Sequence, residues 1–169
     1  LYLIDQKLLD LPILYLSQYI NGNRESYYRL LSDVTVEQAW EPWILFMLDA
    51  VEQTAQWTTD KIEALKTLMD ETVLYVKAVQ PKIYSHELVE LIFTQPYCRV
   101  KDLVENNIAS RNIAAKYLKE LAAAGVLEQM REGREVLYLN TRFLDLLKSN
   151  GNGFRPYPAV SGRAPRDAR

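Results

Sequence analysis

The fold is decided by the stretch Ser110-Arg-Asn-Ile-Ala-Ala-Lys-Tyr-Leu-Lys-Glu-Leu121, which is followed by Gly125-Val126-Leu127. Its spacing predicts a helix that runs from Ser110 to Gly125. The residues expected to face the core of this helix are Ile113, Ala114, Tyr117, Leu118 and Leu121. Beyond it, Val126–Met130 and Glu135–Leu139 alternate around Glu132-Gly133-Arg134, which predicts a β-hairpin.

Two shorter helices are expected before this stretch. Ser85–Thr94 suits a helix that ends at Gln95-Pro96, and a second one holds Leu103 and Val104 and stops at Asn106-Asn107. Three helices followed by a hairpin is the order of a winged helix-turn-helix, and the run Ser110–Leu121 resembles the recognition helix of winged-helix regulators. A last helix is expected over Thr141–Lys148.

The outer face of the predicted recognition helix is a candidate binding surface. Helical spacing turns Arg111, Asn112, Ala115, Lys116 and Lys119 outward, and Arg131 and Arg134 of the hairpin could reach phosphates. Residues 85–148 nevertheless carry nine basic and nine acidic groups, whereas DNA binding depends on several phosphate contacts. Both DNA and a protein surface, either a partner or another part of the chain, remain open as ligands.

The middle of the chain predicts long helices that begin near Pro42. From there, apolar and small residues recur at alternating spacings of four and three over about 36 residues, or roughly 54 Å of helix. They are Ile44, Leu48, Val51, Ala55, Thr58, Ile62, Leu65, Met69, Thr72, Val76 and Val79. Thr58-Thr59-Asp60 could cap a second helix and divide the segment. Two core helices of a bundle and a coiled-coil homodimer both fit this pattern.

The N-terminal region also predicts helices. A stripe of Leu1, Ile4, Leu8 and Leu11 precedes Pro12, which stops this helix or opens the next one. Asn21-Gly22-Asn23 marks a turn, and Arg24–Leu31 suits a short helix with Tyr27, Leu30 and Leu31 inward. The tryptophans Trp40, Trp43 and Trp57 are interpreted as anchors between helices.

Two stretches of this region carry a family resemblance. They are Leu1-Tyr-Leu-Ile-Asp-Gln-Lys-Leu-Leu-Asp-Leu-Pro-Ile-Leu-Tyr15-Leu-Ser-Gln-Tyr-Ile20 and Asn23-Arg24-Glu25-Ser26-Tyr27-Tyr28. They resemble the segment that follows the HPFxxGNGR motif of Fic-domain proteins, which typically transfer AMP from ATP to a protein hydroxyl; Trp40-Glu-x-Trp43 adds to the likeness. The resemblance implies the C-terminal part of such a protein, downstream of the motif: the last catalytic-domain helices, a helical connector and a winged helix.

The resemblance also sets the expectations for chemistry. The intact protein would use ATP and Mg²⁺ to modify a Ser, Thr or Tyr hydroxyl of a target protein, and Tyr27 and Tyr28 would lie close to the nucleotide base. This chain lacks the HPFxxGNGR motif, so we expect it to hold no catalytic residue, cofactor or metal and to be inactive alone. The rival interpretation is a non-enzymatic DNA-binding regulator in which residues 1–80 form a dimerisation domain.

Two near-matches to that motif do not fill its place. His86 is the only histidine and is followed by Glu-Leu instead of Pro-Phe. Asn150-Gly151-Asn152-Gly153-Phe154-Arg155 has the letters of the motif's end, but no His-Pro-Phe precedes it. Neither is interpreted as part of an active site.

Composition sets the broad class and the domain limits. Hydrophobic residues make up 49% of the 169, the net charge is −2, and Cys98 is the only cysteine, which fits a reducing cytoplasmic compartment. No apolar run approaches the roughly 20 residues that span a bilayer, so no membrane association is expected. The expected fold is mainly α, a helical bundle (1–80) followed by the winged helix-turn-helix (81–148) and a disordered tail (149–169).

Overall fold

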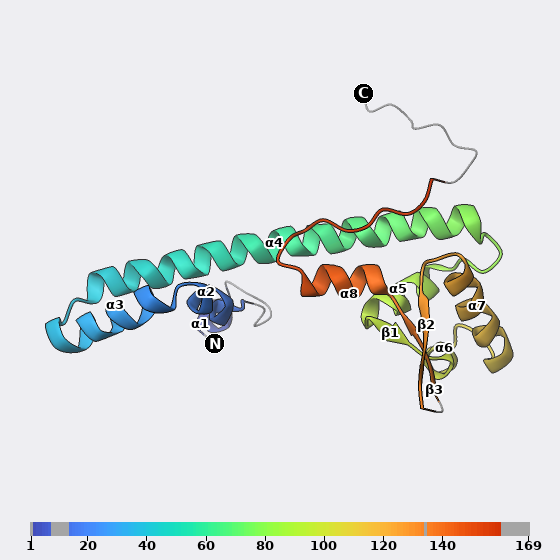
Figure 1. Ribbon diagram of the computed structural model, residues 1–169, viewed down its shortest axis with the longest axis horizontal. Coiled ribbons are helices and arrows are strands. Elements are labelled where there is room, and N and C mark those ends of the chain that lie inside the picture. Colours follow the sequence, from blue (N-terminus) through green and yellow to red (C-terminus); the bar gives the residue numbers. More distant parts are fainter. Residues whose placement is uncertain (1, 8–13, 134, 160–169) are drawn as a thin grey trace, which may run out of the picture. The chain divides into compact units, whose positions relative to one another are not determined.

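The computed structural model describes residues 2–7, 14–133 and 135–159 of the chain. The chain divides into two compact units, Leu1–Ile62 and Glu63–Arg169. The described elements are helices and one three-stranded antiparallel sheet, which confirms the predicted class of a mainly helical protein with a small hairpin (Figure 1). None of the described helices has the length and apolar content needed to cross a membrane.

The first unit contains helices α1 (Tyr2–Asp5), α2 (Leu16–Gly22), α3 (Arg24–Glu37) and the first part of α4 (Trp40–Val79). The helix predicted over Arg24–Leu31 is present but continues to Glu37. Leu30 is buried as expected, whereas the predicted inward placement of Leu31 is wrong, because its side chain is exposed. Of the predicted N-terminal stripe, Leu1, Leu8 and Leu11 lie outside the described residues, as does Pro12.

The predicted division of the middle segment is wrong, because α4 is one helix of 40 residues. The hydroxyls of Thr58 and Thr59 donate to the carbonyls of Thr54 (2.7 Å) and Ala55 (3.0 Å), one turn back, and so cap no new helix. Pro42 lies in the first turn, where a proline sacrifices no intrahelical hydrogen bond. The helix therefore begins where the sequence predicts and continues through the expected break.

Burial along α4 differs between its two ends. Ile44 and Leu48 of the predicted stripe are exposed, and so is Trp40, which was expected to be an anchor. Thr72 and Val76, toward the other end, are fully buried. The stripe is thus a core face only in its C-terminal part, which belongs to the second unit, and the domain limit expected after residue 80 differs from the division at residue 62. A homodimer through the exposed part stays a prediction.

The second unit contains α5 (His86–Thr94), β1 (Tyr97–Cys98), α6 (Val100–Glu105), α7 (Arg111–Ala123), β2 (Glu128–Glu132), β3 (Glu135–Leu139) and α8 (Thr141–Lys148). The predicted helices and hairpin strands are all present. Ser85 and Asn140 cap the helices that follow them: Ser85 Oγ accepts from Leu88 N at 3.1 Å, and Asn140 Oδ1 accepts from Phe143 N at 3.2 Å.

The sheet has the order β1-β3-β2, so β3 is the central strand. The hairpin register pairs Met130 with Leu137, and β1 pairs Cys98 with Tyr138. Sequence reasoning missed β1, because two residues between a proline and a helix are too few for an alternating pattern. This strand joins the turn after α5 to the hairpin.

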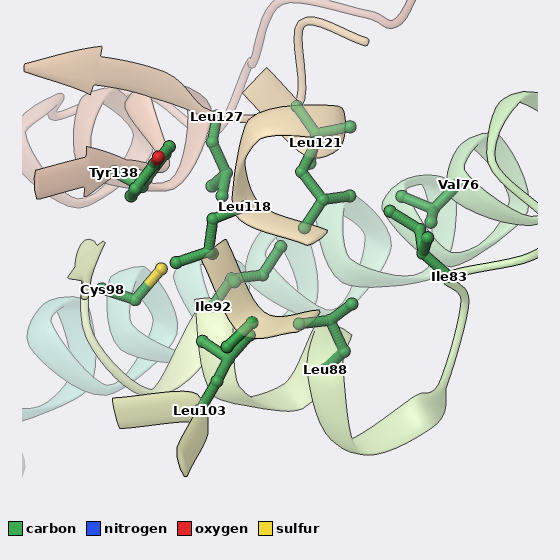
Figure 2. Close-up of a cluster of buried hydrophobic side chains, with 12 residues drawn as sticks. Val76, Ile83, Leu88, Ile92, Cys98, Leu103, Leu118, Leu121, Leu127 and Tyr138 are labelled. Atoms are coloured by element: carbon green, nitrogen blue, oxygen red, sulfur yellow. The ribbon is translucent and has the colours of Figure 1, made fainter. Parts of the chain in front are cut away.

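The main core of the second unit lies between α5, α6, α7 and the sheet, with Val76 of α4 at its border (Figure 2). Leu88, Leu103, Leu118 and Leu121 are fully buried in it. Of the residues predicted to face inward from α7, Ile113 is 45% exposed, a correction to the predicted core face. Burial raises the pKa of the Cys98 thiol to about 12, so Cys98 is the buried neutral side chain that the sequence suggests.

The chain after α8 differs from the predicted disordered tail. Residues 149–159 are described, and they run beside α4 (Figure 1). Phe154 and Tyr157 pack against a second cluster of Leu68, Phe143 and Leu146. The aromatic residues of this segment supply the apolar area for this packing, although its prolines, glycines and arginines suggest a disordered tail. Residues 160–169 lie outside the described part.

Candidate functional site

The two tyrosines predicted to lie near a nucleotide belong to an aromatic cluster of the first unit. The Tyr27 ring lies 5.2 Å from Trp43, 5.3 Å from Tyr28 and 6.4 Å from Phe46, measured between ring centroids. Tyr27 is half-buried, while Tyr28 is 65% exposed. The exposed ring is the only one of the pair free to stack on a ligand from solvent; contact with a nucleotide stays a prediction.

A hydrogen bond extends this cluster to α2. Tyr19 donates its hydroxyl to Asp49 Oδ2, which also accepts from Gln53. The bond to Tyr19 lowers the pKa of Asp49, and the same bond raises the pKa of Tyr19, so the carboxylate is charged and the phenol neutral near pH 7. The bond therefore links α2, which contains Tyr19, to α4, which contains Asp49.

A small cavity lies beside this bond. It has a volume of about 200 Å³ and is lined by Gln18, Tyr19, Gln53, Thr54 and Trp57. Its lining combines two aromatic rings with amide and hydroxyl groups, a mixture that suits a small ligand with an apolar body. The volume is below the roughly 300 Å³ where ligand pockets usually begin, so we assign it no ligand.

The second candidate surface is the outer face of α7. Arg111, Asn112, Lys116 and Lys119 are all exposed, as predicted. A groove of about 490 Å³ runs along this face, lined by Asn112, Ala115, Lys116, Lys119, Glu120 and Ala123. A second groove of about 290 Å³, lined by Val100, Lys101, Val104, Glu105 and Arg111, lies toward α6. Both grooves take lining residues from α7, including Asn112, Lys116 and Lys119 in the first and Arg111 in the second.

The charge of this surface is mixed. Lys116 Nζ lies 3.7 Å from Glu120 Oε1 in an ion pair along α7, and Arg99 pairs with Glu135 of the hairpin at 3.2 Å. Arg131 is exposed on β2, between Met130 and Glu132. Arg134 lies outside the described residues. Acidic side chains thus partly neutralise the predicted cations, which makes the surface less favourable for a polyanion.

Within the described ranges, the titratable side chains do not assemble into an active site. His86 is exposed at the start of α5, next to the capping Ser85. In the described residues, no group of three His, Cys, Asp or Glu side chains is placed to hold a metal ion. Neither the Mg²⁺ that the resemblance implies nor AMP transfer is assigned to these residues.

Sequence reasoning missed one polar cluster. Arg142 of α8 contacts the carbonyls of Gly125 and Arg155 and lies over the ring of Tyr157. The only signal in the sequence is Pro156-Tyr157-Pro158, since a tyrosine between prolines is an apolar anchor on a stiff segment. The residues involved are too far apart along the chain for a local pattern.

The fold and these surfaces define a helical protein with a compact C-terminal module of helices and a small sheet. Residues 68–143 match the family described as protein adenylyltransferase SoFic-like, C-terminal domain. This match confirms the resemblance to the C-terminal part of Fic-family proteins, and the chain is a relative of the Fic-family adenylyltransferases. The match begins at Leu68 in α4 and ends at Phe143 in α8, so the segment around Tyr27 and Tyr28 lies outside it.

Proposed function

We propose that this chain is the C-terminal portion of a Fic-type protein adenylyltransferase, in which residues 81–148 form a winged helix-turn-helix. The intact protein would transfer AMP from ATP, with Mg²⁺, to a hydroxyl of a target protein. The observation that carries the proposal is the family match over residues 68–143. The order α5-β1-α6-α7-β2-β3 supports the winged-helix assignment, because three helices followed by a hairpin build that module.

The surface of the first unit supports the proposal independently. Most of its exposed large hydrophobic side chains lie in α3 and in the first part of α4. They are Tyr28, Leu31, Val36, Trp40, Ile44, Leu45 and Leu48. Where such side chains adjoin one another, another protein surface normally covers them. The rest of a catalytic domain would cover them in the intact protein.

The test is to read the native coding sequence for about 40 codons upstream of Leu1. The proposal expects an in-frame His-Pro-Phe followed by Gly-Asn-Gly-Arg. A reading frame that starts there without this motif removes the enzyme interpretation for the gene. The match of residues 68–143 to the family of C-terminal domains does not depend on this outcome.

The exposed cations of α7 favour one second candidate, a DNA-binding regulator. We expect only weak, sequence-independent DNA binding at about 150 mM salt, because Lys116 pairs with Glu120. With Arg111, Lys119 and Arg131 as the contributing cations, the logarithm of the binding constant should fall against the logarithm of salt with a slope no steeper than about −3. Fluorescence anisotropy with a labelled duplex measures this slope.

A matched variant sharpens the DNA test. Lys119→Glu reverses a charge at the groove and leaves the buried face of α7 intact. If the slope is about −6 or steeper and Lys119→Glu abolishes tight binding, the regulator becomes the better account. If Lys119→Glu changes nothing, the α7 face is available to a protein partner instead.

A further inference from the structure

The segment after α8 is held by a specific set of contacts around Tyr157. The Tyr157 ring stacks on Tyr75 of α4, with centroids 4.4 Å apart and planes 17° from parallel. Its hydroxyl lies 2.9 Å from Thr72 Oγ1, and the guanidinium of Arg142 covers the ring at 4.1 Å. Burial raises the pKa of Tyr157, so the side chain is neutral in this site. One aromatic ring thus joins α4, α8 and the C-terminal segment.

Arg142 links this segment to the end of α7. Its Nε donates to the carbonyl of Arg155 at 3.0 Å, and its Nη1 donates to the carbonyl of Gly125 at 2.7 Å. Gly125 has a positive φ of 72°, the left-handed conformation that ends a helix and favours glycine. The same guanidinium therefore holds the C-terminal segment and the residue where the chain leaves α7.

Tyr75 makes a second link to the same place. Its hydroxyl donates to the carbonyl of Ala124 at 3.0 Å, one residue before Gly125. The last carbonyls of a helix have no partner inside the helix, so side-chain donors there stabilise its final turn. Tyr75 and Arg142 both donate to carbonyls at the end of α7. The Tyr157 ring stacks on Tyr75 and lies under the guanidinium of Arg142.

We propose that residues 150–159 form a latch, with Tyr157 as its anchor, whose binding to α4 and α8 fixes the C-terminal end of α7 and the entry to the β2–β3 hairpin. The groove on the outer face of α7 extends to this end through Lys119, Glu120 and Ala123. Release of the latch would remove the ring that holds Tyr75 and Arg142 in place and would loosen this end of the groove. The latch thereby couples the C-terminal segment to the candidate partner surface, independently of any catalytic activity.

Hydrogen exchange of the full chain, followed by mass spectrometry, tests the latch. For Tyr157→Ala we expect amides of residues 121–128 to exchange about tenfold faster, because local opening of that segment becomes easier. Amides of α5, on the other side of the core, should change less than about twofold. Pro158→Ala is the matched control. Pro158 is exposed and adjacent to Tyr157, so its replacement should leave amide exchange unchanged in residues 121–128 and in α5.

A milder variant covers the case in which Tyr157→Ala loosens the whole unit. Thr72→Val removes the hydroxyl contact with Tyr157 and keeps the side-chain shape in α4. If exchange rises in residues 121–128 but not in α5, the latch is supported. Two results would overturn the latch. One is unchanged exchange in residues 121–128 while the amides of residues 154–159 exchange freely. The other, for Thr72→Val, is a rise of exchange in α5 equal to that in residues 121–128.

Discussion

Replacing Leu118 by alanine is expected to lower the free energy of unfolding of the second unit by about 3 to 4 kcal/mol. Leu118 is fully buried at the centre of the core, among Ile92, Cys98 and Leu127 (Figure 2). Alanine removes most of its contacts and leaves a cavity, because the helices on either side are held by caps and by the sheet. The buried α7 face is therefore the most sensitive part of the module.

Urea titration followed by NMR intensities of the α5 amides measures this loss in the second unit alone. Ile113→Ala, on the same helix, is the matched control, because Ile113 is 45% exposed and should cost less than about 1 kcal/mol. An equal loss for the two variants would contradict the assignment of the α7 faces. It would place Ile113 in the core, as its apolar character alone suggests.

The second large effect is expected for Asn140→Ala, with a loss of roughly 2 to 4 kcal/mol. Asn140 is 1% exposed and precedes α8. Its Oδ1 accepts from Phe143 N at 3.2 Å, and its Nδ2 donates to the carbonyl of Ile92 at 3.3 Å. Alanine removes the cap and leaves two buried backbone groups without these partners, which is costlier than the loss of an exposed hydrogen bond.

Two further variants separate the roles of Asn140. Asn140→Ser keeps an oxygen that can cap α8 and loses the donor to Ile92, so its loss should fall between wild type and alanine. Asn106→Ala removes an exposed side-chain hydrogen bond to the carbonyl of Asp102 and should change stability by less than about 0.5 kcal/mol. The same urea titration applies, and a loss for Asn106→Ala as large as for Asn140→Ala would contradict the importance of burial.

The sequence predicts the elements of the second unit well, because local signals coincide there. Ser85 caps α5, Gly125 ends α7, and the alternation after it gives the hairpin. The faces of the helices are less predictable. The apolar arc of α7 is wider than the surface its neighbours cover, so periodicity places both Ile113 and Leu118 inward although only Leu118 is buried.

The candidate sites divide in the same way. Exposure of Arg111, Lys116 and Lys119 follows from helical period, but the ion pair of Lys116 with Glu120 depends on rotamers that no pattern specifies. The contacts of Tyr157 with Thr72 and Tyr75 join residues more than 80 positions apart. A segment rich in proline, glycine and arginine therefore resembles a disordered tail by composition even where two aromatic residues anchor it.

The most direct test of the central proposal is AMP transfer from labelled ATP with Mg²⁺ by the product of the complete native reading frame. This chain alone serves as the comparison. We expect a labelled protein with the complete product, loss of labelling when the motif histidine is replaced by alanine, and no labelling by this chain alone. Labelling by this chain alone, or a folded complete product that contains the motif and transfers no AMP to any protein in a lysate, would contradict it.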